Sequence, residues 1–201
     1  MNLRDLGEWW RELEEVTDLG PIVRRYFVIG AFDGALTVLG IVIGAAATVG
    51  ANPKAGAFVI AVSISASIAL AISSAVGAYE AERVEKKLHR HSIERAMLVE
   101  LSEEHRTAFR TAAIVSAIVH GAAPVIAALV PVVPFALIPD FPTAMIAATV
   151  LTLGFLFGLG AYLGSLVRER VVITGLRFIA TGLATAAILW ALGAVGLQRI
   201  P

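Results

Sequence analysis

The chain has 201 residues, 58% of them hydrophobic, and a formal net charge of zero. Ordinary soluble domains are about 45–50% apolar, so this composition, with a mean hydropathy of +0.81, indicates a membrane protein. The absence of cysteine excludes disulfides, thiolate metal sites and cysteine nucleophiles. The zero net charge argues against a nucleic-acid partner.

The chain opens with an amphipathic segment. Apolar residues recur at three- and four-residue spacing over residues 3–19, which predicts a helix. Trp9 and Trp10 suit a membrane interface, although the polar face is acidic and unlike that of a lipid-headgroup binder. We expect residues 1–21 to form an amphipathic helix on the protein's own cytoplasmic face, in preference to a ligand-binding role. Gly20-Pro21 should end it.

Five apolar stretches follow, and each has about the 20 residues that a bilayer-spanning helix needs. They cover residues 26–48, 55–79, 111–134, 144–166 and 171–196. Within lipid the backbone must satisfy its own hydrogen bonds, and a helix does so locally. The predicted fold class is therefore an all-α membrane protein, with a five-helix transmembrane domain over residues 22–201.

The first span, "YFVIGAFDGALTVLGIVIG", contains one carboxylate, Asp33. An aspartate at membrane depth costs roughly 2.5–3.5 kcal/mol on insertion scales, and such residues normally face a bundle interior or an aqueous cavity on an ion or proton path. The alternative is a cap or salt bridge near the surface, since Arg24 and Arg25 lie about two turns away. We favour the functional interpretation.

Small residues four apart occur in two of the spans. The pairs are Gly30-Gly34 and Gly40-Gly44 in the first span, and Gly154-Gly158 and Gly160-Gly164 in the fourth. This spacing lets helix backbones approach closely. It predicts tight helix contacts, within the protomer or between protomers.

The second span has no proline and should continue as one helix past the membrane surface, to about residue 91. Ser63, Ser67 and Ser74 fall near one face of it, where serines either hydrogen-bond to the i−4 carbonyl or a neighbouring helix, or line a water path. After the span comes a short cytoplasmic helical insert, residues 80–110, with room for the extension of span two and one further helix.

The insert is rich in carboxylates at three- and four-residue spacing, which places them on shared helix faces. They are Glu82, Glu85, Glu100, Glu103 and Glu104. Hard divalent cations prefer such oxygen ligands, and imidazole from His89, His91 or His105 would suit Fe²⁺, Mn²⁺ or Zn²⁺. The alternative is a charge-rich segment that is simply solvated.

The third span contains His120, which could be a hydrogen-bonded structural residue or a proton carrier. Pro124, Pro131 and Pro134 should break regular helix and give the span a kinked end, followed by a short external turn. Arg177, near the start of span five, should snorkel to the interface. No phosphate loop, nucleophile elbow or His-Glu-x-x-His motif is present, so we expect neither an enzyme nor a permanently bound cofactor.

The distribution of Lys and Arg predicts the orientation. All of them except Lys54 and Arg199 fall in the N-terminal segment, in the 80–110 insert, between spans four and five, or, for Arg177, just inside span five. The positive-inside rule then places the N-terminus in the cytoplasm and the C-terminus outside a multi-pass cell-membrane protein. Five spans require the same odd topology.

Four stretches together resemble the vacuolar iron transporter family. "VIGAFDGALTVLGIVIGA" resembles its first span, and "AISSAVGAYEAERVE" the end of its second. "HGAAPVIAALVPVVPF" resembles its third span, and the sequence from "LFGLGAYLGSLVRERVV" onward its last two. The resemblance covers about residues 22–197 in the same order.

The resemblance implies a homodimer in the lipid membrane that exports Fe²⁺ from the cytoplasm, with Mn²⁺ as a second substrate, in exchange for protons. It implies a path between the first two helices of the two protomers, with Asp33 at the position of the family's aspartate. The insert glutamates would concentrate the metal, Glu80 would pass it inward, His120 would lie on the path, and protonation of Asp33 would release the ion.

Two departures leave an alternative open. The family's Gly-Glu-Tyr is Gly77-Ala78-Tyr79 here, so that carboxylate is missing, while Glu82 replaces a methionine of the family pattern and Glu80 is an additional acid nearby. The insert is also too short for the family's full metal-collecting domain. The alternative is a non-transporting membrane scaffold or metal sensor that keeps the transporter fold.

Overall fold

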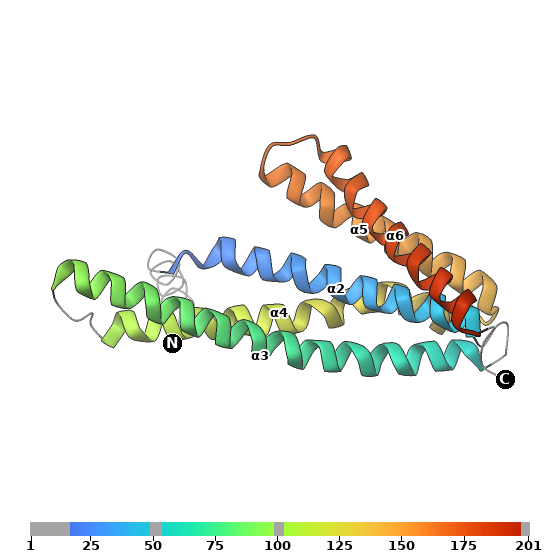
Figure 1. Ribbon diagram of the computed structural model, residues 1–201, viewed down its shortest axis with the longest axis horizontal. Helices are drawn as coiled ribbons and strands as arrows, with labels where there is room; N and C mark the ends of the chain where they lie inside the picture. The colour runs from blue at the N-terminus through green and yellow to red at the C-terminus, as the bar shows by residue number, and fades with distance from the viewer. Residues whose placement is uncertain (1–16, 49–53, 99–102, 198–201) are drawn as a thin grey trace. The chain divides into compact units, whose positions relative to one another are not determined.

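The computed structural model describes residues 17–48, 54–98 and 103–197, except for the side chains of residues 103–106 and 193–197. The helices are α2 (Leu19–Thr48), α3 (Ala55–Met97), α4 (Glu103–Leu137), α5 (Phe141–Leu166) and α6 (Val171–Leu197), in the order that Figure 1 shows. All five are long and apolar enough to cross a membrane, and the described residues contain no strand. The predicted five-span, all-α architecture is confirmed. Most of the predicted N-terminal amphipathic helix lies outside the described residues.

Helix α2 begins at Leu19, seven residues before the apolar stretch predicted from the sequence. Gly20 and Pro21 lie in its first turn, where proline is tolerated because the N–H it lacks would have no helical partner. Asp18, just before the helix, has a φ of 50°, a left-handed conformation that aspartate adopts more readily than most residues. As a result, Arg24 and Arg25 belong to the same helix as Asp33.

Helix α3 has 43 residues and ends at Met97, beyond the predicted limit near residue 91. Leu98 follows with a φ of 53°, which takes the backbone out of the helix. Helix α4 then begins at Glu103. The second helix expected in the 80–110 insert is therefore continuous with the third span, and the described part of the insert comprises the end of α3, Leu98 and the beginning of α4.

The three prolines expected to break the third span lie inside α4, which continues as helix to Leu137. Each proline removes one backbone N–H from the helix. Membrane helices tolerate this loss where neighbouring helices and local adjustments satisfy the freed groups. The short turn predicted after the span is present, at residues 138–140.

The chain divides into two compact units, each described here by itself. The first unit comprises Met1–Gly30 and Ala71–Ala123. Leu19 and Ala112 form a small buried cluster in it, which joins the start of α2 to α4. A methyl group added at Gly121 would lie 2.9 Å from the Ala71 carbonyl oxygen, so α3 and α4 approach closely there.

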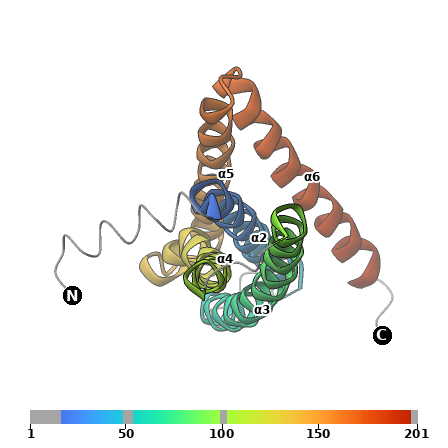
Figure 2. The same ribbon diagram turned by 90° about the vertical axis from the view of Figure 1, so that its left-hand side faces the viewer.

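The second unit comprises Ala31–Leu70 and Pro124–Pro201. Its largest core cluster joins α2, α3, α4 and α5, and includes Val42, Val59, Val132 and Ala148, all 8% exposed or less. Helices α5 and α6 form a hairpin whose turn is visible in Figures 1 and 2.

The glycine pairs differ in what they contact. An added methyl group at Gly30 would meet Ala123 at 2.9 Å, and at Gly34 it would overlap the Pro124 backbone, so this pair packs against α4. Gly160 and Gly164 pack in the same way against Thr174 of α6. The remaining predicted positions behave differently: Gly40 meets only the Leu189 side chain, and Gly44, Gly154 and Gly158 have no such atom within 4 Å.

Candidate functional site

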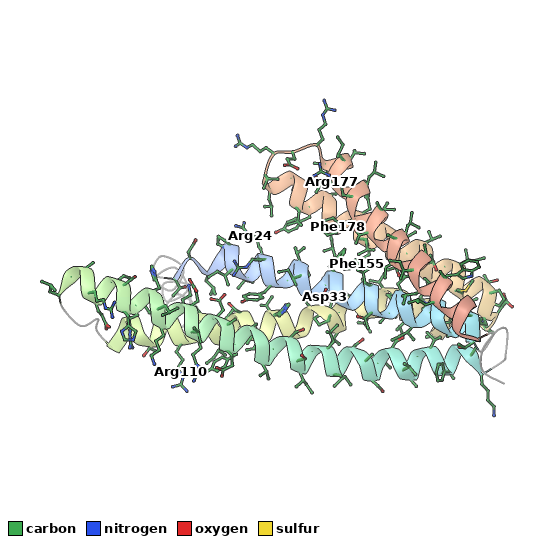
Figure 3. The ribbon with its side chains drawn as sticks, in the orientation of Figure 1. Arg24, Asp33, Arg110, Phe155, Arg177 and Phe178 are labelled. Atoms are coloured by element: carbon green, nitrogen blue, oxygen red, sulfur yellow. The ribbon has the colours of Figure 1, made fainter. Side chains whose placement is uncertain are left out.

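Asp33 lies in the second unit, about midway along α2 (Figure 3), and its residue is exposed. Its neighbours fix the rotation of the helix. Phe32 packs edge-on against Phe178 of α6, with ring centroids 5.1 Å apart, and Gly34 packs against Pro124 of α4. Asp33 and Thr37, one turn apart, therefore form a polar stripe on the surface of the protomer.

An ionised carboxylate in this stripe would be unfavourable in direct contact with the lipid chains. The most apolar window of α2 has a mean hydropathy of 2.1, whereas an ionised aspartate at the bilayer centre costs roughly 2.5–3.5 kcal/mol. Such a carboxylate is expected against water, an ion or another polypeptide. The surface around Asp33 is therefore a candidate ion path.

His120 lies in the first unit and is hydrogen-bonded to α2. Its Nδ1 is 2.9 Å from the carbonyl oxygen of Tyr26, and its ring lies 5.0 Å from the Tyr26 ring. The absence of a side chain at Gly30 makes room for this contact, because a Cβ there would lie 3.0 Å from Nδ1. A carbonyl only accepts hydrogen bonds, so Nδ1 carries the proton, and in the neutral ring Nε2 keeps a lone pair for a proton or a metal.

Glu82 is a buried carboxylate of the first unit. Its side chain is 5% exposed, and Oε1 lies 3.4 Å from Nη2 of Arg25, whose side chain is 61% exposed. Ala78 is buried one turn earlier on the same face of α3. The buried carboxylate therefore lies one helical turn beyond the position at which the resemblance implied a glutamate.

The other predicted metal ligands are more dispersed. Glu80 is half exposed and pairs with Arg83 at 2.9 Å, and Glu85 is exposed. Glu100, and the side chains of Glu103 and Glu104, lie outside the described part of the chain. Among the residues that are described, no three His, Asp or Glu side chains gather closely enough to hold a metal ion.

Ser67 makes one of the two kinds of contact considered for the serines of span two, whereas the snorkelling of Arg177 stays a prediction. The Ser67 hydroxyl donates to the Ser63 carbonyl at 2.6 Å, which is the i−4 bond expected of a buried helical serine. Arg177 is exposed at the start of α6, with Nη1 3.8 Å from Glu169.

A basic groove that was not predicted from the sequence lies in the first unit, between α3 and α4. Its volume is about 450 Å³, and its lining includes Arg83, Lys86, Lys87, Arg90 and Arg110. The sequence contains part of this pattern, because the basic residues of α3 recur at three- and four-residue spacing and so share a face. The contribution of Arg110 could not be seen, because it depends on how α4 packs beside α3.

The sequence model of the VIT family matches residues 24–107 and 90–194. The chain is also 32% identical over 169 residues to an uncharacterised protein of Methanocaldococcus jannaschii, a match that covers 82% of this chain and 85% of the relative. The matched ranges together cover residues 24–194 and overlap all five apolar helices. The chain therefore belongs to the VIT family, the vacuolar iron transporters, and is a multi-pass membrane protein of a transporter family.

Proposed function

We propose that the protein exports divalent metal ions from the cytoplasm, with Fe²⁺ as the main substrate and Mn²⁺ as a second, in exchange for protons. The observation that carries the proposal is Asp33, an exposed carboxylate in the middle of an apolar helix of a transporter family. Carboxylate oxygens suit these ions. Because protonation neutralises the carboxylate, proton and metal compete for it, and this competition provides the coupling.

The proposal includes a homodimer. Within one protomer the surface that carries Asp33 and Thr37 is open. A second copy placed against this surface would shield the carboxylate from lipid and bring a second aspartate to the path. Two carboxylates have the charge that balances one divalent ion, so the dimer makes the site electrostatically complete.

The approach from the cytoplasm would use residues of the first unit. Glu80 is half exposed and able to receive an ion, although Arg83 competes for it. At a later point on the proposed path from the cytoplasm, Nε2 of His120 would accept a proton or a metal ion. Glu82, Glu85, Glu100, Glu103 and Glu104 would raise the local metal concentration. The positive-inside rule supports a cytoplasmic location for the end of α3.

The test is metal flux in proteoliposomes under a pH gradient, with Fe²⁺ and Mn²⁺ as substrates and internal pH recorded at the same time. We expect Asp33→Asn to abolish both metal flux and the opposing proton flux, because the amide keeps the shape but loses the exchangeable charge. Glu169→Gln is the matched control, since Glu169 is an exposed carboxylate outside the apolar spans. Wild-type flux in the Asp33→Asn protein would remove Asp33 from the mechanism.

Measurements on the wild-type protein distinguish transport from the scaffold or sensor alternative. Calorimetry would measure metal binding in detergent, beside the flux assay. Binding without flux in the wild-type protein would favour a sensor, and the absence of both would favour a scaffold.

A further inference from the structure

The basic groove of the first unit is chemically unlike the candidate metal path. Among the side chains that the structure describes, its lining contains no carboxylate and five cations: Arg83, Lys86, Lys87, Arg90 and Arg110. Tyr79, Val84 and Phe109 supply the less polar walls. Four of the cations come from one face of α3, and Arg110 of α4, labelled in Figure 3, completes the set.

The partners of these cations leave much of the positive charge uncompensated. Arg83 pairs with Glu80 at 2.9 Å, and Lys86 donates to the Thr17 carbonyl at 2.9 Å, which carries no formal charge. Lys87 and Arg110 make no ion pair with any residue that the structure describes.

Arg90 adds a second indication. Its Nε lies 3.7 Å from Glu94, but this nitrogen is buried and makes no hydrogen bond. Buried donors normally have a hydrogen-bond partner, so an unsatisfied one at the edge of a groove indicates a missing acceptor.

We propose that this groove binds an anion that carries phosphate groups. Arg and Lys are the side chains that recognise phosphate, through charge-assisted hydrogen bonds from several donors at once. A volume of about 450 Å³ lies within the range of small-molecule sites. A free metal cation would be repelled by the same charges, so the ligand is distinct from the transported ion and the inference does not depend on the proposed transport cycle.

The phosphate could come from a soluble compound or from the headgroup of an anionic phospholipid. Tyr79 is the last residue of the apolar stretch 55–79, and Arg90 lies eleven residues further along α3, about 16 Å at the helical rise. The groove therefore extends from the expected membrane surface outward and is open to both sources.

The experiment uses the full chain and two probes. Inorganic pyrophosphate is titrated into the protein in phosphatidylcholine nanodiscs, with binding measured by calorimetry. Short-chain phosphatidylglycerol is titrated into the protein in detergent, with phosphatidylcholine of the same chain length as the reference lipid. Binding of pyrophosphate identifies a soluble ligand, and preference for phosphatidylglycerol without pyrophosphate binding identifies a lipid headgroup. Either result supports the groove as a phosphate site.

The groove variant is Lys87→Gln with Arg110→Gln, and the matched control is Arg95→Gln with Arg170→Gln, which removes the same charge from exposed positions outside the groove. We expect the groove variant to weaken binding of the responding probe by about tenfold or more, because each lost charge-assisted hydrogen bond is worth roughly that factor. The control should stay within about twofold. If the double variant does not fold, Lys87→Gln alone, an exposed position, serves instead.

Two outcomes would overturn the proposal. One is that the wild-type protein binds neither probe. The other is that the control variant loses as much affinity as the groove variant, since binding would then follow net charge and not the groove.

Discussion

Replacing Arg25 would leave the Glu82 carboxylate buried without its cation. At the 3.4 Å separation of the two charges, Coulomb's law with an effective dielectric constant of about 20 gives roughly 5 kcal/mol. Solvent screening reduces this value, because the Arg25 side chain is 61% exposed. Removing one partner of a fully buried pair costs about 3–5 kcal/mol. We therefore expect Arg25→Gln to lower the free energy of unfolding by roughly 1–3 kcal/mol.

Thermal unfolding in detergent measures this loss. For a chain of roughly 150–250 residues, 1 kcal/mol corresponds to about 2–4 °C, so the midpoint should fall by roughly 2–12 °C. Arg24→Gln is the control, because Arg24 is an exposed neighbour on the same helix. Adding Glu82→Gln to Arg25→Gln should restore at least half of the loss, because a neutral amide is cheaper to bury than a carboxylate. A double variant less stable than Arg25→Gln, or a single variant as stable as the control, would refute the reasoning.

Two further predictions concern stability. Gly34→Ala should lower the midpoint in detergent, by roughly 1–3 kcal/mol in unfolding free energy, because its methyl group would overlap the Pro124 backbone. Gly158→Ala, with no such atom within 4 Å, should raise the unfolding free energy by up to about 1 kcal/mol, because alanine has a higher helix propensity than glycine. Shifts of the same sign in the two variants would contradict the packing. The Thr143 hydroxyl and N–H both donate to Asp140 at the start of α5 and lower the pKa of its carboxyl. The stability from this cap is complete above the unfolded-state pKa and is lost as pH falls through the lower folded-state pKa. Unfolding midpoints recorded from about pH 6 to about pH 3 should therefore decline less steeply in Asp140→Asn, and equal slopes would exclude the cap as a contributor.

Local sequence features predicted the spans because their signal is the length of an apolar run, which no tertiary contact is needed to interpret. The close contact at Gly30 and Gly34 was also predicted from a local feature, the four-residue spacing of the two glycines, although the sequence could not identify α4 as the partner. Both helices extend beyond their predicted limits: α2 begins at Leu19, in a turn that contains Gly20 and Pro21, and α3 ends at Met97, after the charged residues of the insert. The length of an apolar run reflects the thickness of the membrane core, and it does not locate the end of the helix.

The candidate sites depended more strongly on tertiary structure. The prominence of Asp33 followed from a carboxylate in an apolar segment, but its exposure depends on how Phe32 and Gly34 are packed. The pairing of Glu82 with Arg25 joins residues 57 positions apart. Such a pair is set by the relative rotation of two helices, which spacing within one helix does not determine.

The proline at position 124 has a mechanical consequence for α4. Proline has no backbone N–H, so the His120 carbonyl lacks the hydrogen bond that residue 124 would otherwise donate, and this turn of α4 resists bending less. Flexing of α4 therefore costs less at this turn than in an uninterrupted helix, and Pro124→Ala would restore the hydrogen bond and make the helix stiffer there.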